Sequence, residues 1–328
     1  MHCWRTSLAA LLIGGAAAAI PVQAQDWPTR PVTMVVPFAA GGPVDTLGRI
    51  LGPPLGEALG QTVVIENLSG AGGSTGSNRV KDASPDGYTF VLGSIGTHTL
   101  NQLMSKKPPY DAATDFAPVI LLVDVPLVLI VRKDLAIDGL KDFIAHARQH
   151  QGKMQYGSGG TGTSSHISCV LLNLAMGVDI PHIPYRGGGP ALVDLTAGRL
   201  DYICNIVSTA VPAIEAKSVR AVATLTRERA EVLPDLPTAH EQGLTDFGAY
   251  TWNAIFLPKT TPRPIVDKLN AAMRRVLDAP PVRQRLKDAG LTVVVPERRT
   301  PDYLGRFVAD EIAKWAVPIK ASGVTEAQ

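Results

Sequence analysis

Short apolar runs alternate with glycine-rich loops and helical stretches through the first hundred residues of the chain. The apolar runs predict strands at residues 32–37, 62–66 and 88–93. A helical stretch from about 44 to 59, interrupted by Pro53 and Pro54, follows the first strand, and another helix ends at residue 83. This repetition predicts an α/β fold with a largely parallel sheet, whose ligand loops lie at the carboxyl ends of the strands.

The same pattern returns after a long apolar, β-branched stretch at residues 118–131. Because Pro126 lies inside it, the stretch is too broken for a central strand but suits a first crossing between two lobes. Further strands are expected at 154–157, 179–184, 202–207, 221–226 and 250–257. Further helices are expected at 140–149, 166–176, 238–242, 264–277 and 301–321, with one more ending at 197.

The length of the chain also predicts two lobes, since roughly 300 residues after the N-terminal segment exceed what one hydrophobic core usually supports. A return crossing is expected near residues 247–250. Lobe 1 would then comprise residues 25–125 and 248–328, and lobe 2 residues 126–247.

The N-terminal segment has the pattern of a secretory signal peptide. Arg5 precedes an apolar run at 8–20, and Val22-Gln23-Ala24 suits signal peptidase. The run is shorter than the roughly 20 residues that a membrane span needs. We therefore expect cleavage after Ala24 and a freely diffusing periplasmic protein, because Cys3 is not placed for lipoprotein processing.

Charge and cysteine usage narrow the expected partners. A formal net charge of +2 without a long Lys/Arg cluster argues against nucleic acid. No stretch supplies enough Cys and His for a metal site. Only Cys169 and Cys204 follow the signal segment; two buried free thiols are expected, and pairing in an oxidising compartment is the alternative.

Two loops match motifs of enzymes. Residues 157–162 spell the dinucleotide fingerprint G-x-G-x-x-G, but NAD chemistry is not expected in an exported protein and no cofactor is predicted. Residues 72–76 spell the nucleophile elbow G-x-S-x-G, with Ser74 as nucleophile. Residues 67–71 separate this motif from its strand, and no loop Asp and His suit a triad. A secreted α/β hydrolase is therefore only the alternative hypothesis.

Taken together, the Gly/Ser/Thr loops favour binding of an anion without catalysis. Small residues let backbone N–H groups and hydroxyls approach an anion, and helix N-termini add partial positive charge. Asp45 is either a structural partner for free N–H groups or a partner for a ligand ammonium. His166 either orients its loop or touches ligand. Arg186 either pairs with a carboxylate or points to solvent.

Several spaced motifs point to one protein family. They are WPTRP at 27–31, VPFAAGG at 36–42 with Asp45, EN at 66–67, GAGG at 70–73, PDGY at 85–88, PYD at 109–111, DFAP at 115–118, GTGT at 160–163 with His166, HIPYRG at 182–187, LPDLPT at 233–238 and KW at 314–315. With these motifs, essentially the whole mature chain resembles the substrate-binding proteins of the tripartite tricarboxylate transporter family, also called Bug receptors.

The resemblance implies a type II periplasmic binding protein fold, with two lobes joined by a hinge of two crossing strands, and no catalysis. It implies a receptor that passes a small carboxylate to the two subunits of a membrane permease. We also expect the protein to be a monomer. Because Cys204-Asn205 stands where the family often has an aromatic residue and an acid, a di- or tricarboxylate or an aromatic carboxylate is expected rather than an amino acid. The expected ligand-binding residues are Phe38, Ala39, Ala40, Gly41, Gly42, Asp45, Ser94, Thr97, Ser158, Gly160, Thr161, Gly162, Thr163, His166, Tyr185, Arg186, Gly187 and Asn205.

Overall fold

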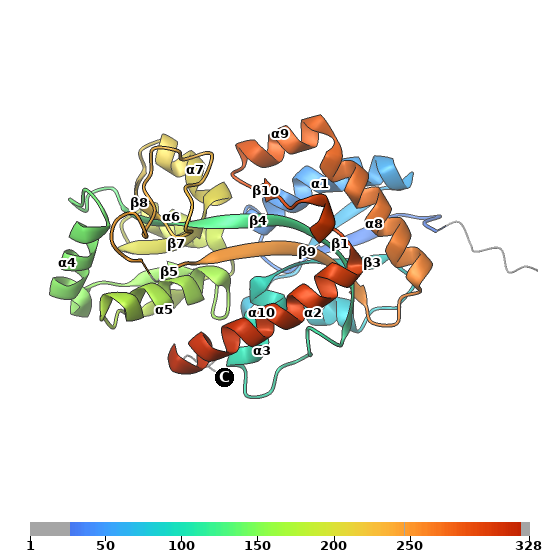
Figure 1. The fold of residues 1–328 in the computed structure, drawn as a ribbon, viewed down its shortest axis with the longest axis horizontal. Helices are drawn as coiled ribbons and strands as arrows, with labels where there is room; N and C mark the ends of the chain where they lie inside the picture. The colour runs from blue at the N-terminus through green and yellow to red at the C-terminus, as the bar shows by residue number, and fades with distance from the viewer. Residues whose placement is uncertain (1–26, 246, 323–328) are drawn as a thin grey trace, which may run out of the picture.

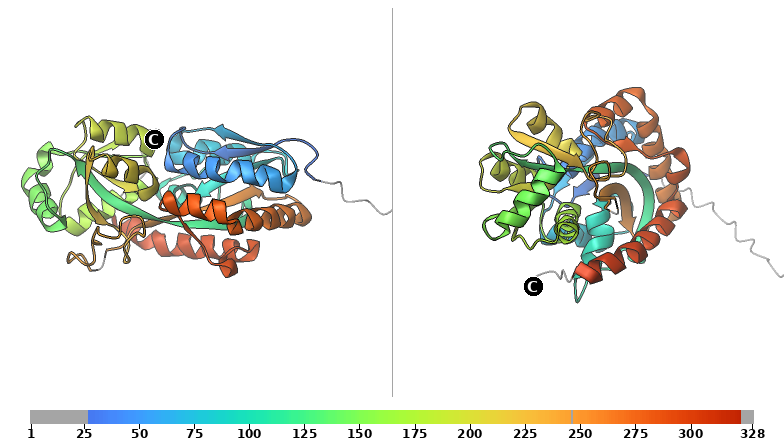
Figure 2. Two further views of the ribbon diagram at one scale, coloured as in Figure 1. Left: turned by 90° about the horizontal axis from the view of Figure 1, so that it is seen from above. Right: turned by 60° about the vertical axis from the view of Figure 1, so that its left-hand side comes forward.

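Two α/β lobes lie side by side in the computed structural model, which describes residues 27–245 and 247–322 (Figures 1 and 2). The expected signal peptide and its cleavage point lie outside the described residues. No helix within them is long and apolar enough to cross a membrane.

Lobe 1 is built on a sheet in the order β2-β1-β3-β9-β4, with the short β10 on the far side of β4. Its strands are β1 (Val32–Val36), β2 (Val63–Asn67), β3 (Thr89–Ser94), β9 (Tyr250–Pro258), β10 (Thr292–Val293) and the first part of β4 (Phe116–Arg132). Its helices are α1 (Pro43–Leu59), α2 (Ser74–Lys81), α3 (Asn101–Met104), α8 (Arg263–Asp278), α9 (Pro280–Asp288) and α10 (Pro301–Ser322).

Lobe 2 is built on a sheet in the order β6-β5-β7-β4, with β8 also pairing with β4. Its strands are β5 (Tyr156–Ser158), β6 (His182–Pro184), β7 (Tyr202–Ile206), β8 (Val219–Thr224) and the second part of β4. Its helices are α4 (Leu140–His150), α5 (Ser164–Met176), α6 (Gly188–Thr196) and α7 (Val207–Glu215).

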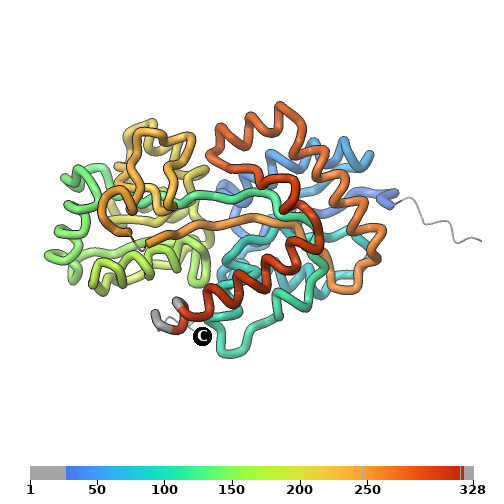
Figure 3. Tube along the Cα trace, in the orientation of Figure 1, coloured from blue at the N-terminus to red at the C-terminus, as the bar shows by residue number. Residues whose placement is uncertain are grey.

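Strand β4 passes through both lobes without a break, so the expectation that Pro126 makes this stretch too broken for a central strand was wrong. Pro126 pairs with Tyr250 at the very start of β9, and from Leu127 onward β4 pairs with β7 instead. Because β4 changes its pairing partner here, the N–H group that Pro126 lacks does not interrupt a continuous ladder of hydrogen bonds. Figure 3 shows β4 and β9 as the two crossings between the lobes.

The sheet is parallel only within each lobe's outer strands. β1 pairs in parallel with β2 and β3, and β5 pairs in parallel with β6 and β7. β9 is antiparallel to β3, and β4 is antiparallel to β7, β8 and β9. The expectation of a largely parallel sheet therefore holds away from the crossing strands and fails at them.

Alternation along the buried strands divides each lobe into two apolar cores. In β4, Leu127 and Leu129 face one core of lobe 2, whereas Val128 and Ile130 face the other. In lobe 1, Val36 and Val35 face opposite cores in the same way. Because successive strand side chains point to opposite faces, strands buried on both sides are apolar throughout.

Three local expectations differ from the structure. Residues 238–242 form turns rather than a helix, and the side chains of Thr238 and Glu241 bond each other's backbone N–H groups without a helix following. Helix α1 continues through Pro53 and Pro54. Helices α7 and α9 were not predicted from the sequence.

The expectation of two free thiols was also wrong. Cys169 in α5 and Cys204 in β7 form a disulfide, with their Cα atoms 5.5 Å apart. Both residues are fully buried in one core of lobe 2. The pairing follows from the packing of α5 on β7, which brings together residues separated by 35 positions in sequence.

Candidate functional site

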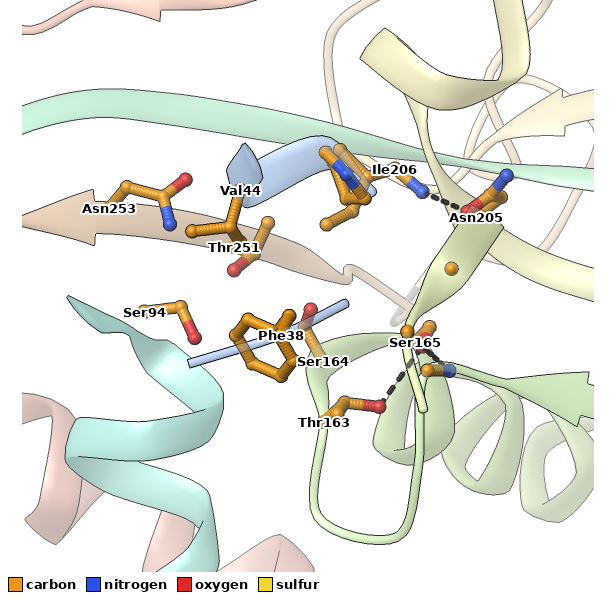
Figure 4. A pocket seen from close by; sticks show the side chains of 14 residues that line it. Phe38, Val44, Ser94, Thr163, Ser164, Ser165, Asn205, Ile206, Thr251 and Asn253 are labelled. Atoms are coloured by element: carbon orange, nitrogen blue, oxygen red, sulfur yellow. Dashed lines mark hydrogen bonds between the residues drawn. The ribbon is translucent and has the colours of Figure 1, made fainter. Parts of the chain in front are cut away.

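A cavity lies where the lobes meet, between the end of β7 and the start of β9 (Figure 4). The volume of the cavity is about 30 Å³. Its lining residues are Phe38, Pro43, Val44, Ser94, Gly159, Thr163, Ser164, Ser165, Gly187, Gly188, Asn205, Ile206, Thr251 and Asn253. Both lobes and both crossing strands therefore contribute to one site.

Four helices begin at the cavity. Pro43 starts α1, Ser164 starts α5, Gly188 starts α6, and Ile206 is the residue before α7. The first backbone N–H groups of a helix have no partner within it, and the helix dipole makes this end partly positive. Four such ends around one cavity favour a bound anion.

The cavity favours an anion without any charged side chain in its wall, since its lining residues are all neutral. Arg186, the cation expected nearby, is exposed and does not line the cavity. Its carbonyl instead accepts a hydrogen bond from Ala39 N at 3.2 Å, which joins a loop of lobe 2 to a loop of lobe 1. Neutral donors thus surround the space, as expected for an anion that must later be released.

Of the two roles considered for Asp45, its contacts fit the structural one. Its carboxylate accepts hydrogen bonds from Gly41 N at 2.9 Å, Asn67 Nδ2 at 2.9 Å and Arg49 Nε at 2.8 Å. Burial raises the pKa of this carboxyl, but the bonds from Arg49, Gly41 and Asn67 outweigh burial and hold the pKa below its ordinary value. The Asp45 carboxylate thereby fixes the loop between β1 and α1.

The loop between β5 and α5 is held by two histidines, the buried His166 and the half-buried His182. Ser158 Oγ lies 2.6 Å from His182 Nε2, and Gly162 N donates to His166 Nδ1 at 3.3 Å. The two imidazole rings stack at 4.1 Å. Burial lowers the pKa of His166 to about 3, helped by the neighbouring His182, and burial lowers the pKa of His182 to about 4. His166 therefore orients the loop as a neutral side chain and does not line the cavity.

The lobes touch beside the cavity through two glycines. A Cβ at Gly72 would lie 2.3 Å from the carbonyl oxygen of Thr161, and one at Gly162 would lie 2.0 Å from Asn101 Oδ1. Both glycines have positive φ, +59° and +84° respectively. Only hydrogen atoms fit at these points, so the lobes are in close contact, backbone to backbone at Gly72 and backbone to side chain at Gly162.

The structure brings five of the expected binding residues to the cavity wall: Phe38, Ser94, Thr163, Gly187 and Asn205. The other expected residues are not part of that wall, and several support it from behind. The Thr97 hydroxyl bonds the backbone of Ser94, and Tyr185 donates its hydroxyl to Asp194. Ser158 and Gly160 bond each other within their loop.

Nine lining residues were missed: Pro43, Val44, Gly159, Ser164, Ser165, Gly188, Ile206, Thr251 and Asn253. Thr251 and Asn253 had a signal in the sequence, because two polar residues at alternate positions of an apolar strand share a face. Tyr250 and Trp252 point the other way, where both donate to the buried carboxylate of Glu311. Thr251 and Asn253 consequently face the cavity.

Ser74 is not placed as a hydrolytic nucleophile. Its Oγ is buried and accepts a hydrogen bond from Asn101 Nδ2 at 2.9 Å, and the short helical turn Ala71–Gly73 separates it from β2. Ser158 does contact a histidine, but its side chain is fully buried. No group of three potential metal ligands occurs among the described residues.

Comparison with known proteins agrees with this architecture. Residues 47–324 match the model of the tripartite tricarboxylate transporter family receptor. MatC from Rhodopseudomonas palustris, solved with bound malate, is 42% identical with a TM-score of 0.87, covering 89% of this chain and 100% of its own. The periplasmic binding protein BugD is 36% identical with a TM-score of 0.88, covering 92% and 100%.

A further similar structure is that of R. palustris Rpa4515 with adipate. It is 36% identical with a TM-score of 0.87, covering 91% of this chain and 99% of its own. The fold is thus that of the periplasmic binding proteins, as the sequence predicted. The chain belongs to the tripartite tricarboxylate transporter family of receptors, whose members bind substrates and are not enzymes.

Proposed function

We propose that this protein is a periplasmic receptor that captures a small carboxylate between its lobes and delivers it to a membrane permease. The observation that carries the proposal is the cavity itself, where four helix N-termini meet and every lining side chain is neutral. The bound malate of MatC and adipate of Rpa4515 support the same ligand class.

Binding would use donors that both lobes supply. Thr163 Oγ1 caps α5 by accepting from His166 N, which leaves the N–H groups of Ser164 and Ser165 without a partner in the described chain. A carboxylate at this point would also lie against the start of α6 at Gly188. Because such donors are short-ranged and partly buried, affinity should fall only modestly with salt.

Release would require the lobes to separate. The Ala39–Arg186 backbone bond and the two glycine contacts join the lobes beside the cavity. We propose that the ligand adds the remaining contacts that favour closure, and that the permease binds the closed form. The proposal includes signal cleavage after Ala24, a monomer in the periplasm, and lobes divided near residues 125 and 247.

The test is isothermal calorimetry with the mature protein and a panel of acids. Succinate, malate, adipate, citrate and benzoate cover the proposed class, and aspartate is the matched control because it adds an ammonium group to the succinate skeleton. We expect at least one acid without an ammonium to bind, and aspartate to bind far more weakly, since no carboxylate lines the cavity. Failure of every acid to bind would refute the proposed function.

A further inference from the structure

Thr251 has a buried hydroxyl without a partner at the cavity. The residue is 1% exposed, and its Oγ1 makes no hydrogen bond within the described chain. A buried hydroxyl left unpaired destabilises a fold, so an unpaired hydroxyl in a cavity wall indicates a missing partner. In Figure 4 the Thr251 side chain points into the space between Ser94 and Phe38.

Two further polar side chains lie beside it on the same wall. Ser94 and Asn253 are direct partners in the pairing of β3 with β9, and Asn253 is two residues from Thr251 along β9. Asn253 Nδ2 donates to the carbonyl of Gly93 at 3.1 Å, which fixes the amide. Ser94 Oγ and Asn253 Oδ1 have no hydrogen-bond partner within the described residues. Lobe 1 therefore presents a neutral polar patch, Ser94, Thr251 and Asn253, to the cavity.

This polar patch comes from different elements than the start of α5 and α6. Ser164, Ser165 and Gly188 belong to lobe 2, whereas the patch belongs to β3 and β9 of lobe 1. A ligand that satisfied only the helix ends of lobe 2 would leave Thr251 Oγ1 unpaired. A ligand with a second oxygen group would satisfy both walls and thereby join the lobes.

We propose that Thr251, with Ser94 and Asn253, is the specificity-determining contact for a second oxygen-bearing group at the other end of the ligand. This inference rests on the proposed function and narrows its substrate class to small acids with a second carboxylate or a hydroxyl. Simple monocarboxylates lack the group that the patch binds. Amino acids are disfavoured because a buried ammonium would find no carboxylate in the wall.

The chain offers a matched control for Thr251. Thr224 on β8 is fully buried, its Oγ1 is also unpartnered, and it does not line the cavity. Thr→Val replaces a hydroxyl by a methyl group of the same shape, so at either position the change removes an unpaired polar atom and leaves the fold intact. Only Thr251→Val removes a contact to ligand.

The experiment measures succinate and butyrate affinities by calorimetry in the unaltered protein, Thr251→Val, Thr251→Ser and Thr224→Val. Succinate is expected to bind more tightly than butyrate, and Thr251→Val is expected to weaken succinate roughly 10- to 100-fold, the range for a hydrogen bond to a charged group. Thr251→Ser and Thr224→Val should stay within about threefold, and butyrate should be unaffected by Thr251→Val.

Equal succinate affinity in Thr251→Val and Thr224→Val would overturn this inference while the proposed function stood. The same holds if the unaltered protein binds butyrate as tightly as succinate. If the unaltered protein binds none of the acids of either experiment, the proposed function itself falls, so the two failures are distinguishable. Unfolding temperatures of all variants show that a loss of affinity is not a loss of fold.

Discussion

Two glycine-rich loops of this chain have nearly the same composition and different roles. The loop at residues 70–73 precedes α2 in lobe 1, and the loop at 159–162 precedes α5 in lobe 2. After the first, Ser74 is buried against Asn101; after the second, Ser164 lines the cavity. Thr163 caps α5, whereas α2 has no side-chain cap.

The comparison shows that a small-residue loop acquires its role from what the following helix faces. The N-terminus of α5 faces the space between the lobes, so its free N–H groups can bind an anion. The loop at 70–73 instead presents Gly72 to the backbone of Thr161. The loop of lobe 2 thus opens onto the cavity, whereas the loop of lobe 1 is in close backbone contact with it beside the cavity.

Gly72→Ala should have the largest effect on this arrangement. Its Cβ would meet the carbonyl oxygen of Thr161 at 2.3 Å, and a backbone atom cannot turn aside as a side chain can. We expect calorimetry to show at least a 100-fold loss of ligand affinity in a folded protein. Gly60→Ala is the control, because Gly60 has a similar φ of +72° and nothing within 4 Å. Equal affinities in these variants would show that the lobes need not approach so closely.

Gly162→Ala should have a smaller effect, because the atom it meets is Oδ1 of the Asn101 side chain. Asn101 would have to give up its bonds to Gly72 O and Ser74 Oγ, so we expect roughly a tenfold loss of affinity. Gly177→Ala is the control for backbone strain, because Gly177 has a φ of +70° and open space around it. A loss of affinity in Gly177→Ala as large as in Gly162→Ala would assign the effect to strain.

Acid should destabilise the protein through histidines that are buried neutral. The folded pKa values, about 3 for His98 and His166 and about 4 for His182, lie below the ordinary value of 6.5 because of burial. As the pH falls from 6.5 towards 4, the unfolded chain takes up protons that the folded chain does not, so stability is lost over that window.

For His98, which is fully buried, the loss approaches about 1.4 kcal/mol per pH unit. Thermal unfolding followed between pH 7 and pH 4 measures it. An unfolding temperature that is constant from pH 7 to pH 5 would contradict the prediction.

Arg186→Ala should have the smallest effect, less than about threefold in affinity. Its side chain is exposed outside the cavity wall, and the bond that joins the lobes uses its carbonyl, which alanine keeps. Complete loss of binding in this variant would show that the Arg186 side chain, and not the helix N-termini, is the basis of affinity.

The sequence predicted the lobes, most strands and the loops around the site, because alternating apolar runs and small-residue loops are local patterns. It did not predict the disulfide, since the pairing of Cys169 with Cys204 depends on how α5 packs on β7. Nor did it show that Pro126 stands where β4 changes partners. Such facts arise between elements distant in sequence.

The residues of the candidate site were likewise predicted only in part. Phe38, Thr163 and Gly187 belong to loops that look like anion-binding loops, and they line the cavity. Thr251 lies within an expected strand to which no ligand-binding residue was assigned, and the pairing of β9 with β3 and β4 brings its hydroxyl to the site. Asp45 and His166 follow the same loops but are turned away from the cavity, towards partners that hold the backbone.

The central place of β9 in lobe 1 has a consequence for how the chain folds. β9 lies between β3 and β4, yet it follows the whole of lobe 2 in the sequence. Until β9 pairs with them, β3 and β4 lack the strand that joins them, so the first half of lobe 1 cannot complete its sheet. Lobe 2, made of consecutive residues, can close its contacts first at a lower entropic cost. We therefore expect lobe 2 to fold early during refolding, and lobe 1 to wait for its last central strand.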